Sequence, residues 1–129
     1  MFCSKDNAVS LGASGHAVGP TAFDTSDVNL TSVGFTNMGG RVAINVETFM
    51  YETAGSYGAR IGLYKNAEML FTIGTLYVPA SYTVPFHIRW IGTIGAGTDT
   101  YYMKIRRING SAGSYAQLST LYVLELKKW

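Results

Sequence analysis

The two histidines, His16 and His87, are the side chains of this sequence best suited to proton transfer or metal binding near neutral pH. They lie far apart in the chain and show no metal-ligand spacing, and His87 falls on the polar face of a predicted strand. Cys3 is the only cysteine in the sequence. A single cysteine excludes an intrachain disulfide and a thiolate zinc site built from one chain. We therefore expect no metal site and no cofactor.

Nucleophilic and acid-base chemistry have weak candidates. The segment Leu11-Gly12-Ala13-Ser14-Gly15 resembles a nucleophile elbow, but its spacing differs from G-x-S-x-G and it lacks the flanking strand and helix. Glu47 and Glu52 are an odd number of residues apart on one predicted strand, so they face opposite sides of it. Asp24 and Asp27 are typical of turn residues. We expect no catalytic residue and no enzymatic activity; an enzyme acting on sugars or esters through Asp24 and Glu47 is the alternative.

A basic run at residues 104–107 suggests nucleic-acid binding, because Tyr101 and Tyr102 stand beside it. On a strand, however, Lys104 and Arg106 share one face while Arg107 points to the other. Such a patch is only two charges wide, and the net charge of the chain is +2. Sequence-independent binding needs more phosphate contacts. We expect a solvated or ion-paired sheet face, and no nucleic-acid partner.

The elements that must position these residues are strands. Alternating apolar and polar residues predict two long strands over 41–50 and 81–90, and shorter ones over 28–35, 59–64, 69–78, 101–108 and 118–127. Glycine-rich clusters separate them, as at Asn37-Met38-Gly39-Gly40. Pro85 inside a strand pattern indicates an edge strand or a bulge. We predict an all-β protein, an antiparallel β-sandwich or jelly roll of about eight strands.

Length and composition indicate one domain with a hydrophobic core. The chain has 129 residues, of which 47% are hydrophobic and 14% charged. Residues 1–27 are mostly small or polar, so we expect an extended N-terminal arm there and the β-sandwich domain over residues 28–129. No window approaches the roughly 18 apolar residues of a membrane span, and the first residues do not form a signal peptide. We expect no membrane partner.

The C-terminal half resembles a known group of proteins. The segments GAGTDTYYMKIRRINGSAGSY and LSTLYVLELKK, preceded by RVAINVETFMYETAGSYGARIGLYKNAEML, are similar to the closing pattern of many bacteriophage virion proteins. The resemblance covers roughly residues 28–128. It implies a jelly roll similar to the tumour necrosis factor and complement globular-head folds, usually assembled as a homotrimer.

The resemblance implies a structural role in the virion, with synthesis in the host cytoplasm. Receptor-binding fibres of this group carry the module after a fibrous shaft, and none precedes it in this sequence. We therefore expect a trimeric capsid decoration (cement) protein whose partner is the major capsid protein. The alternative is a receptor-binding or collar/tail-fibre module that contacts a host surface glycan or another tail protein.

Aromatic and apolar side chains supply the candidate contacts. The sequence has nine tyrosines, which suit protein or carbohydrate surfaces. The final strand is apolar on both faces, so each face needs cover. We predict a trimer interface at Tyr101, Tyr102, Leu121, Tyr122 and Val123. We predict that the arm contacts the capsid or another partner through Phe2, Val9, Leu11 and Val18.

Overall fold

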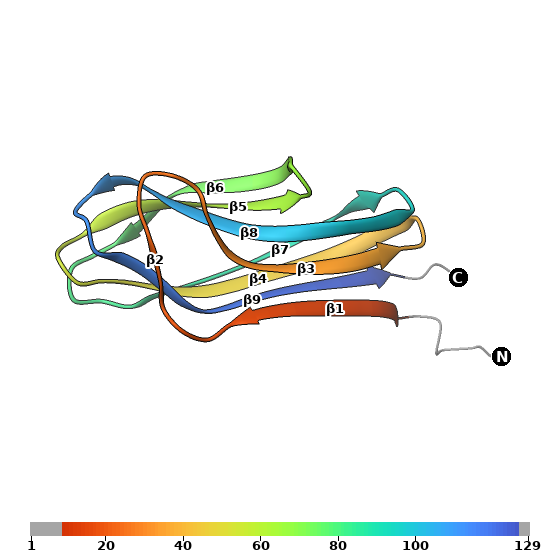
Figure 1. The fold of residues 1–129 in the computed structure, drawn as a ribbon, viewed down its shortest axis with the longest axis horizontal. Coiled ribbons are helices and arrows are strands. Elements are labelled where there is room, and N and C mark those ends of the chain that lie inside the picture. Colours follow the sequence, from red (N-terminus) through yellow and green to blue (C-terminus); the bar gives the residue numbers. More distant parts are fainter. Residues whose placement is uncertain (1–8, 127–129) are drawn as a thin grey trace.

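The protein is built from strands packed as two layers (Figure 1). The computed structural model describes residues 9–126. It has nine strands there: β1 (Val9–Ala17), β2 (Thr21–Phe23), β3 (Val28–Asn37), β4 (Gly40–Glu52), β5 (Tyr57–Lys65), β6 (Glu68–Val78), β7 (Val84–Ile94), β8 (Gly97–Gly110) and β9 (Ser114–Leu126). Within these residues there is no helix that is long and apolar enough to cross a membrane.

The strand order is that of a two-sheet sandwich. Sheet A has the order β1-β9-β4-β7, with β2 also paired to β9, and sheet B has the order β3-β8-β5-β6. Every pairing between neighbours is antiparallel. From β3 onward the chain passes between the sheets at each connection except the β5–β6 hairpin. The fold is a jelly roll. The predicted fold class is therefore confirmed.

The core lies between the sheets and is supplied mainly by their central strands. Side chains alternate between the two faces of a strand, so every second residue points inward. The fully buried inward residues include Val42, Ile44, Val46 and Met50 of β4, Ile61 and Leu63 of β5, Tyr101, Met103 and Ile105 of β8, and Leu121 and Val123 of β9. The period-two pattern in the sequence thus correctly indicated which residues share a face.

Pro85 lies on β7, which ends the main strand path of sheet A. It is opposite Phe49 of β4, the one neighbouring strand to which β7 is paired. Proline is tolerated at such a position because its missing N–H can face away from the ladder. The predicted edge strand is confirmed.

The N-terminal segment differs from the prediction. We expected residues 1–27 to form an arm, but β1 pairs with β9 from Ala13↔Val123 to Ala17↔Ser119, and β2 pairs with β9 further along. These residues therefore belong to sheet A, whereas residues 1–8 lie outside the described part of the chain. The sequence was misleading because small side chains were interpreted as a lack of burial, and here they permit close packing instead.

Gly15 shows why β1 has small residues. A Cβ built on Gly15 would lie 2.3 Å from the Ser32 carbonyl oxygen and 2.9 Å from Thr31 Oγ1. The backbones of β1 in sheet A and β3 in sheet B therefore approach too closely for any side chain at this position.

We predict that Gly15→Ala lowers the free energy of unfolding by about 1 to 3 kcal/mol, because the new methyl group must push two backbones apart. The matched control is Gly34→Ala on β3, where a Cβ would meet nothing within 4 Å and the backbone has no positive φ. That variant should be as stable as the parent or slightly more stable. Urea unfolding of both variants measures the difference, and equal stabilities would contradict the close approach.

Candidate interaction surfaces

Three of the predicted trimer residues lie in the core of a single chain. Tyr101, Leu121 and Val123 each have 0% of their surface exposed. They point inward from β8 and β9, which are internal strands of sheets B and A. They cannot contact another subunit, so this part of the prediction is wrong. The physical reason is that the inward face of β9 is already covered by the opposite sheet.

The other two predicted residues lie on opposite sides of the molecule. Tyr102 is half-buried on the outer face of sheet B, whereas Tyr122 is 38% exposed on the outer face of sheet A. The five predicted residues therefore form no single surface. Each outer face is a separate candidate site.

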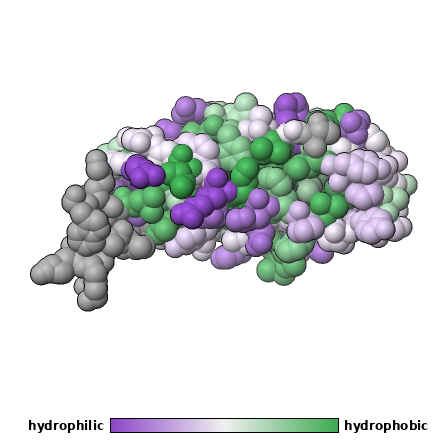
Figure 2. Space-filling view, turned by 180° about the vertical axis from the view of Figure 1, so that it is seen from behind, coloured by the Kyte–Doolittle hydropathy of each residue, from purple (hydrophilic) through white to green (hydrophobic). Residues whose placement is uncertain are grey.

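The outer face of sheet A contains an apolar row. Leu124, Ala43 and Ile91 are direct neighbours across β9, β4 and β7. Ile91 is 45% exposed. Tyr122 lies beside this row and leans over Gly12, whose built Cβ would be 2.9 Å from the tyrosine hydroxyl. Figure 2 shows one broad face of the molecule, where apolar side chains lie next to strongly hydrophilic ones.

The outer face of sheet B contains two tyrosines and a lysine. Tyr64 of β5 and Tyr102 of β8 are direct cross-strand neighbours. Lys104 Nζ lies 4.6 Å from the centre of the Tyr64 ring and 5.4 Å from that of Tyr102. The Tyr64 ring itself lies over Gly62, where a Cβ would be 2.8 Å from a ring carbon. Partial burial raises the pKa of the Tyr64 phenol, and the nearby Asp27 carboxylate raises it further.

Two arginines continue this face of sheet B. Arg60 of β5 is directly opposite Arg106 of β8, and the Arg60 side chain lies along Gly74 of β6. In the described part of the chain, the salt bridge formed is Lys65–Glu68 at 3.7 Å, which involves neither arginine. Sequence reasoning found Lys104 and Arg106 but missed Arg60. Arg60 could be found only from the pairing register of β5 and β8, and a local sequence pattern does not show which residues of two distant strands lie opposite each other.

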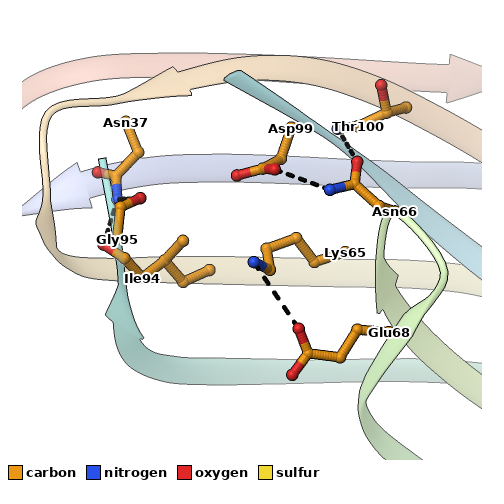
Figure 3. Close-up of polar contacts among 8 residues, drawn as sticks. All are labelled: Asn37, Lys65, Asn66, Glu68, Ile94, Gly95, Asp99 and Thr100. Carbon is orange, nitrogen blue, oxygen red and sulfur yellow. Dashed lines mark hydrogen bonds and ion pairs between the residues drawn. The ribbon is translucent and has the colours of Figure 1, made fainter. Parts of the chain in front are cut away.

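Asparagine side chains hold one end of the sandwich together (Figure 3). Asn66, in the β5–β6 turn, donates from Nδ2 to Asp99 Oδ1 at 2.8 Å and accepts from the Thr100 N–H at 3.0 Å. Its own N–H donates to the Thr100 carbonyl at 2.7 Å. Its φ of 54° is in the left-handed region, which asparagine tolerates better than most residues. These contacts tie the turn to β8.

We predict that Asn66→Ala lowers the free energy of unfolding by about 2 to 3 kcal/mol, because it removes two side-chain hydrogen bonds and places alanine at a positive φ. Asn66→Gly is the matched control, since it loses the same hydrogen bonds but adopts the φ without strain. Its stability should fall between those of Asn66→Ala and the parent in chemical denaturation. Equal stabilities of Asn66→Gly and Asn66→Ala would show that the backbone conformation contributes nothing.

Among the catalytic candidates, Ser14 and His16 are in contact, and the carboxylates of Asp24 and Glu52 accept backbone hydrogen bonds. The Ser14 oxygen lies 3.3 Å from His16 Nε2 at the exposed edge strand β1. Asp24 accepts a hydrogen bond from the Ser26 N–H at 2.9 Å, which is a turn geometry and confirms that interpretation of Asp24. Glu52 accepts one from the Ser81 N–H at 3.1 Å. Within residues 9–126 there is no pocket and no cluster of three metal-binding side chains.

Of the four residues predicted to contact a partner from the arm, the structure describes the side chain of Val18 alone. Val18 follows β1 and is 73% exposed, so it is free to meet a partner. Val9 and Leu11 lie on β1, and only their backbone positions are described. Phe2 lies outside the described residues.

Two buried tyrosines of the core differ in how their hydroxyls are satisfied. Tyr57 OH donates to the Tyr51 carbonyl at 2.9 Å, with the Tyr115 carbonyl at 3.3 Å. Tyr101 OH is buried and has no hydrogen-bond partner among the described residues. Burial raises the pKa of Tyr101 to about 12, and the Asp99 carboxylate contributes to the same direction.

We predict effects of opposite sign when each hydroxyl is removed. Tyr101→Phe should raise the free energy of unfolding by about 1 kcal/mol, because it removes an unpaired buried group, whereas Tyr57→Phe should lower it by a similar amount. Thermal unfolding of the two variants checks the signs, and a loss of stability in Tyr101→Phe would contradict the unpaired hydroxyl.

A further prediction concerns Tyr101→Phe at alkaline pH. Because the folded-state pKa of Tyr101 is raised from 10.0 to about 12, the folded chain holds this proton where the unfolded chain releases it. Stability should therefore fall as the pH rises above 10, and less steeply in Tyr101→Phe. Denaturant titrations at several alkaline pH values measure the slope; identical slopes would contradict the shift.

Comparisons with known proteins show a likeness of fold. No protein-family model and no curated protein sequence matches the chain. Among solved structures, the VP2 subviral particle of infectious bursal disease virus superposes with a TM-score of 0.67 and 12% identity, over 90% of this chain and 33% of that one. Eiger TNF from S. frugiperda has a TM-score of 0.52 and 14% identity, over 92% of this chain and 94% of that one.

A third structural neighbour is neither a viral protein nor a TNF. Dimeric latent PorU from Porphyromonas gingivalis matches with a TM-score of 0.60 and 8% identity, over 91% of this chain and 12% of that one. The chain spans about a third of the length of the viral chains it matches, at 31 to 33%. At these identities the likeness concerns the fold alone, and the jelly roll is the architecture common to the viral and TNF structures.

Proposed function

We propose that this chain is a structural protein of a virus particle, and more specifically a trimeric decoration (cement) protein of a bacteriophage capsid. The observation that carries the proposal is the superposition of 90% of the chain on the VP2 subviral particle structure. The phage assignment rests on the sequence resemblance over residues 28–128. The major capsid protein is the proposed partner, and the virion the proposed location.

The proposed mechanism is linkage between binding and shell stability. A protein that binds the assembled shell but not the separated subunits stabilises the shell by mass action. A specific contact of this kind buries about 800 Å² on each partner. A sandwich with two broad outer faces offers one face for its own oligomer and leaves the other for a partner. Exposed Val18 adds a contact beside β1.

The outer face of sheet A is the proposed trimer surface. It carries Leu124 and Ile91 on either side of Ala43, which is itself fully buried, with Tyr122 beside them. This set replaces the buried residues of the sequence-based interface. Its aromatic and aliphatic side chains are of the types that form the buried centres of protein interfaces.

We predict that Ile91→Glu converts a trimer into monomers, because it places a carboxylate in the buried centre of the interface. Ile91 is already 45% exposed in the single chain, so the fold should tolerate the change. Tyr77→Glu is the matched control, since Tyr77 is 63% exposed on β6 of sheet B. Light scattering after size-exclusion chromatography gives the mass. A monomeric parent protein at micromolar concentration, or a trimer that persists in Ile91→Glu, would overturn this assignment.

The decoration role is tested with expanded capsids from which the protein has been removed. Adding back the parent protein should restore binding and raise the temperature at which the shells disassemble, measured by light scattering and electron microscopy. Ile91→Glu should restore less. If the protein does not bind, or if bound protein leaves heat resistance unchanged, the decoration role is wrong.

The second candidate function is the receptor-binding or collar module. The outer face of sheet B favours it, because tyrosine rings and cations meet there without an enclosed pocket. If a host glycan binds this protein, and if the free protein reduces adsorption of the phage to host cells, the second candidate is favoured over the first.

A further inference from the structure

The outer face of sheet B combines positive charge with aromatic support over a small area. We define the cationic face as five residues of β5 and β8: Arg60, Tyr64, Tyr102, Lys104 and Arg106. Their inward neighbours on β8, Met103 and Ile105, are fully buried, so the even-numbered residues between them point outward. Each of the five is half-buried, which means that the sheet itself limits their motion.

The two arginines of the cationic face are held in an unfavourable pair. Arg60 and Arg106 are direct partners in the β5–β8 register. Like charges directly opposite one another destabilise a sheet. Arg60 is further confined along Gly74, with its side-chain carbons 3.2 Å from a built Cβ. In addition, Arg106 Nε is buried and has no hydrogen-bond partner among the described residues. An anion bound between the guanidinium groups would offset the repulsion and can accept hydrogen bonds from their terminal N–H groups, although not from the buried Arg106 Nε.

Lys104 is placed by the two tyrosines. Its ammonium group lies over both rings, at 4.6 Å from Tyr64 and 5.4 Å from Tyr102. This cation–π contact holds the charge beside the arginine pair without neutralising it. It also covers the ring faces on which a nucleic-acid base would stack. The geometry therefore favours a ligand that presents anionic groups over one that presents bases.

Next to the cations, β3 offers neutral hydrogen-bonding groups, while the nearby carboxylate of Asp27 lies at the Tyr64 end of the face and away from the paired arginines of the β5–β8 register. Asn29 is opposite Lys104, and Ser32 is opposite Tyr102, both on β3 and both exposed. An amide and a hydroxyl suit the hydroxyl groups of a sugar. A strand of nucleic acid would need a longer series of cations, and the chain's net charge is only +2.

We propose that the cationic face binds an acidic polysaccharide, with a sugar carboxylate between Arg60 and Arg106, a second anionic contact at Lys104, and sugar hydroxyls at Asn29 and Ser32. This site deepens the receptor-binding candidate and is independent of the decoration role. Its test uses isolated protein and no capsid, so failure here leaves the capsid experiment unaffected.

The experiment measures binding of the full chain to three immobilised polymers by biolayer interferometry: polygalacturonate, neutral dextran, and single-stranded poly(dT). The parent protein should bind polygalacturonate, bind dextran and poly(dT) more weakly, and lose affinity for polygalacturonate as salt increases. Arg106→Gln should weaken the polygalacturonate contact by about tenfold or more, because one charged hydrogen-bonding partner is lost. Arg60→Gln should weaken binding by a similar factor. Because it leaves the partly buried Arg106 in place, it tests the site even if Arg106→Gln fails to fold.

The matched control is Arg41→Gln. Arg41 is exposed on β4, on the outer face of sheet A, so the variant removes the same charge from the opposite side of the sandwich. Its affinity should stay within about twofold of the parent, because long-range charge effects are screened. The proposal is overturned if the parent does not bind polygalacturonate, if all three arginine variants lose affinity equally, or if poly(dT) binds more tightly than polygalacturonate.

Discussion

Burial of the inward faces of β8 and β9 is the constraint on which the rest of this structure depends. Each strand lies inside its sheet, β9 between β1 and β4 and β8 between β3 and β5, so both are held by hydrogen bonds on two sides. Of their inward side chains, Tyr101, Leu121 and Val123 have no exposed surface. Because side chains alternate, this burial also decides which residues must point outward.

The two outer faces that result differ in chemistry. Sheet A presents a short apolar row that includes Ile91 and Leu124, whereas sheet B presents Arg60 and Arg106 side by side with Lys104 over two tyrosine rings. A jelly roll supports many functions, so function must be argued from these faces and not from the fold. One face suits a second copy of the chain, and the other suits an anionic ligand. The proposed trimer surface and the proposed polysaccharide site therefore lie on different faces, whereas a capsid partner on sheet B would share that face with the polysaccharide.

Close backbone contacts and hydrogen-bonded turns hold the layers in register. Gly15 lets β1 meet the backbone of β3, and Asn66 ties the β5–β6 turn to β8. Where β9 bulges, Leu118 adopts a φ of 52° and the Thr48 and Ser119 hydroxyls are 2.9 Å apart, so buried polar groups are paired there. Tyr101 is the contrasting case, because its buried hydroxyl has no such partner among residues 9–126. These details decide local stability without changing the fold.

The sequence by itself determined the strands from residue 28 onward and which side chains share a face, because a period of two is a local property of the chain. It limited Pro85 to an edge strand or a bulge, and the strand order decided for the edge. It did not reveal β1, whose small residues resemble an arm until β3 is seen beside them. Nor could it show that Leu121 and Val123 face the opposite sheet, or that Arg60 lies opposite Arg106. Those facts depend on which distant strands pair and in what register, and only the tertiary structure decides pairing between residues far apart in the chain.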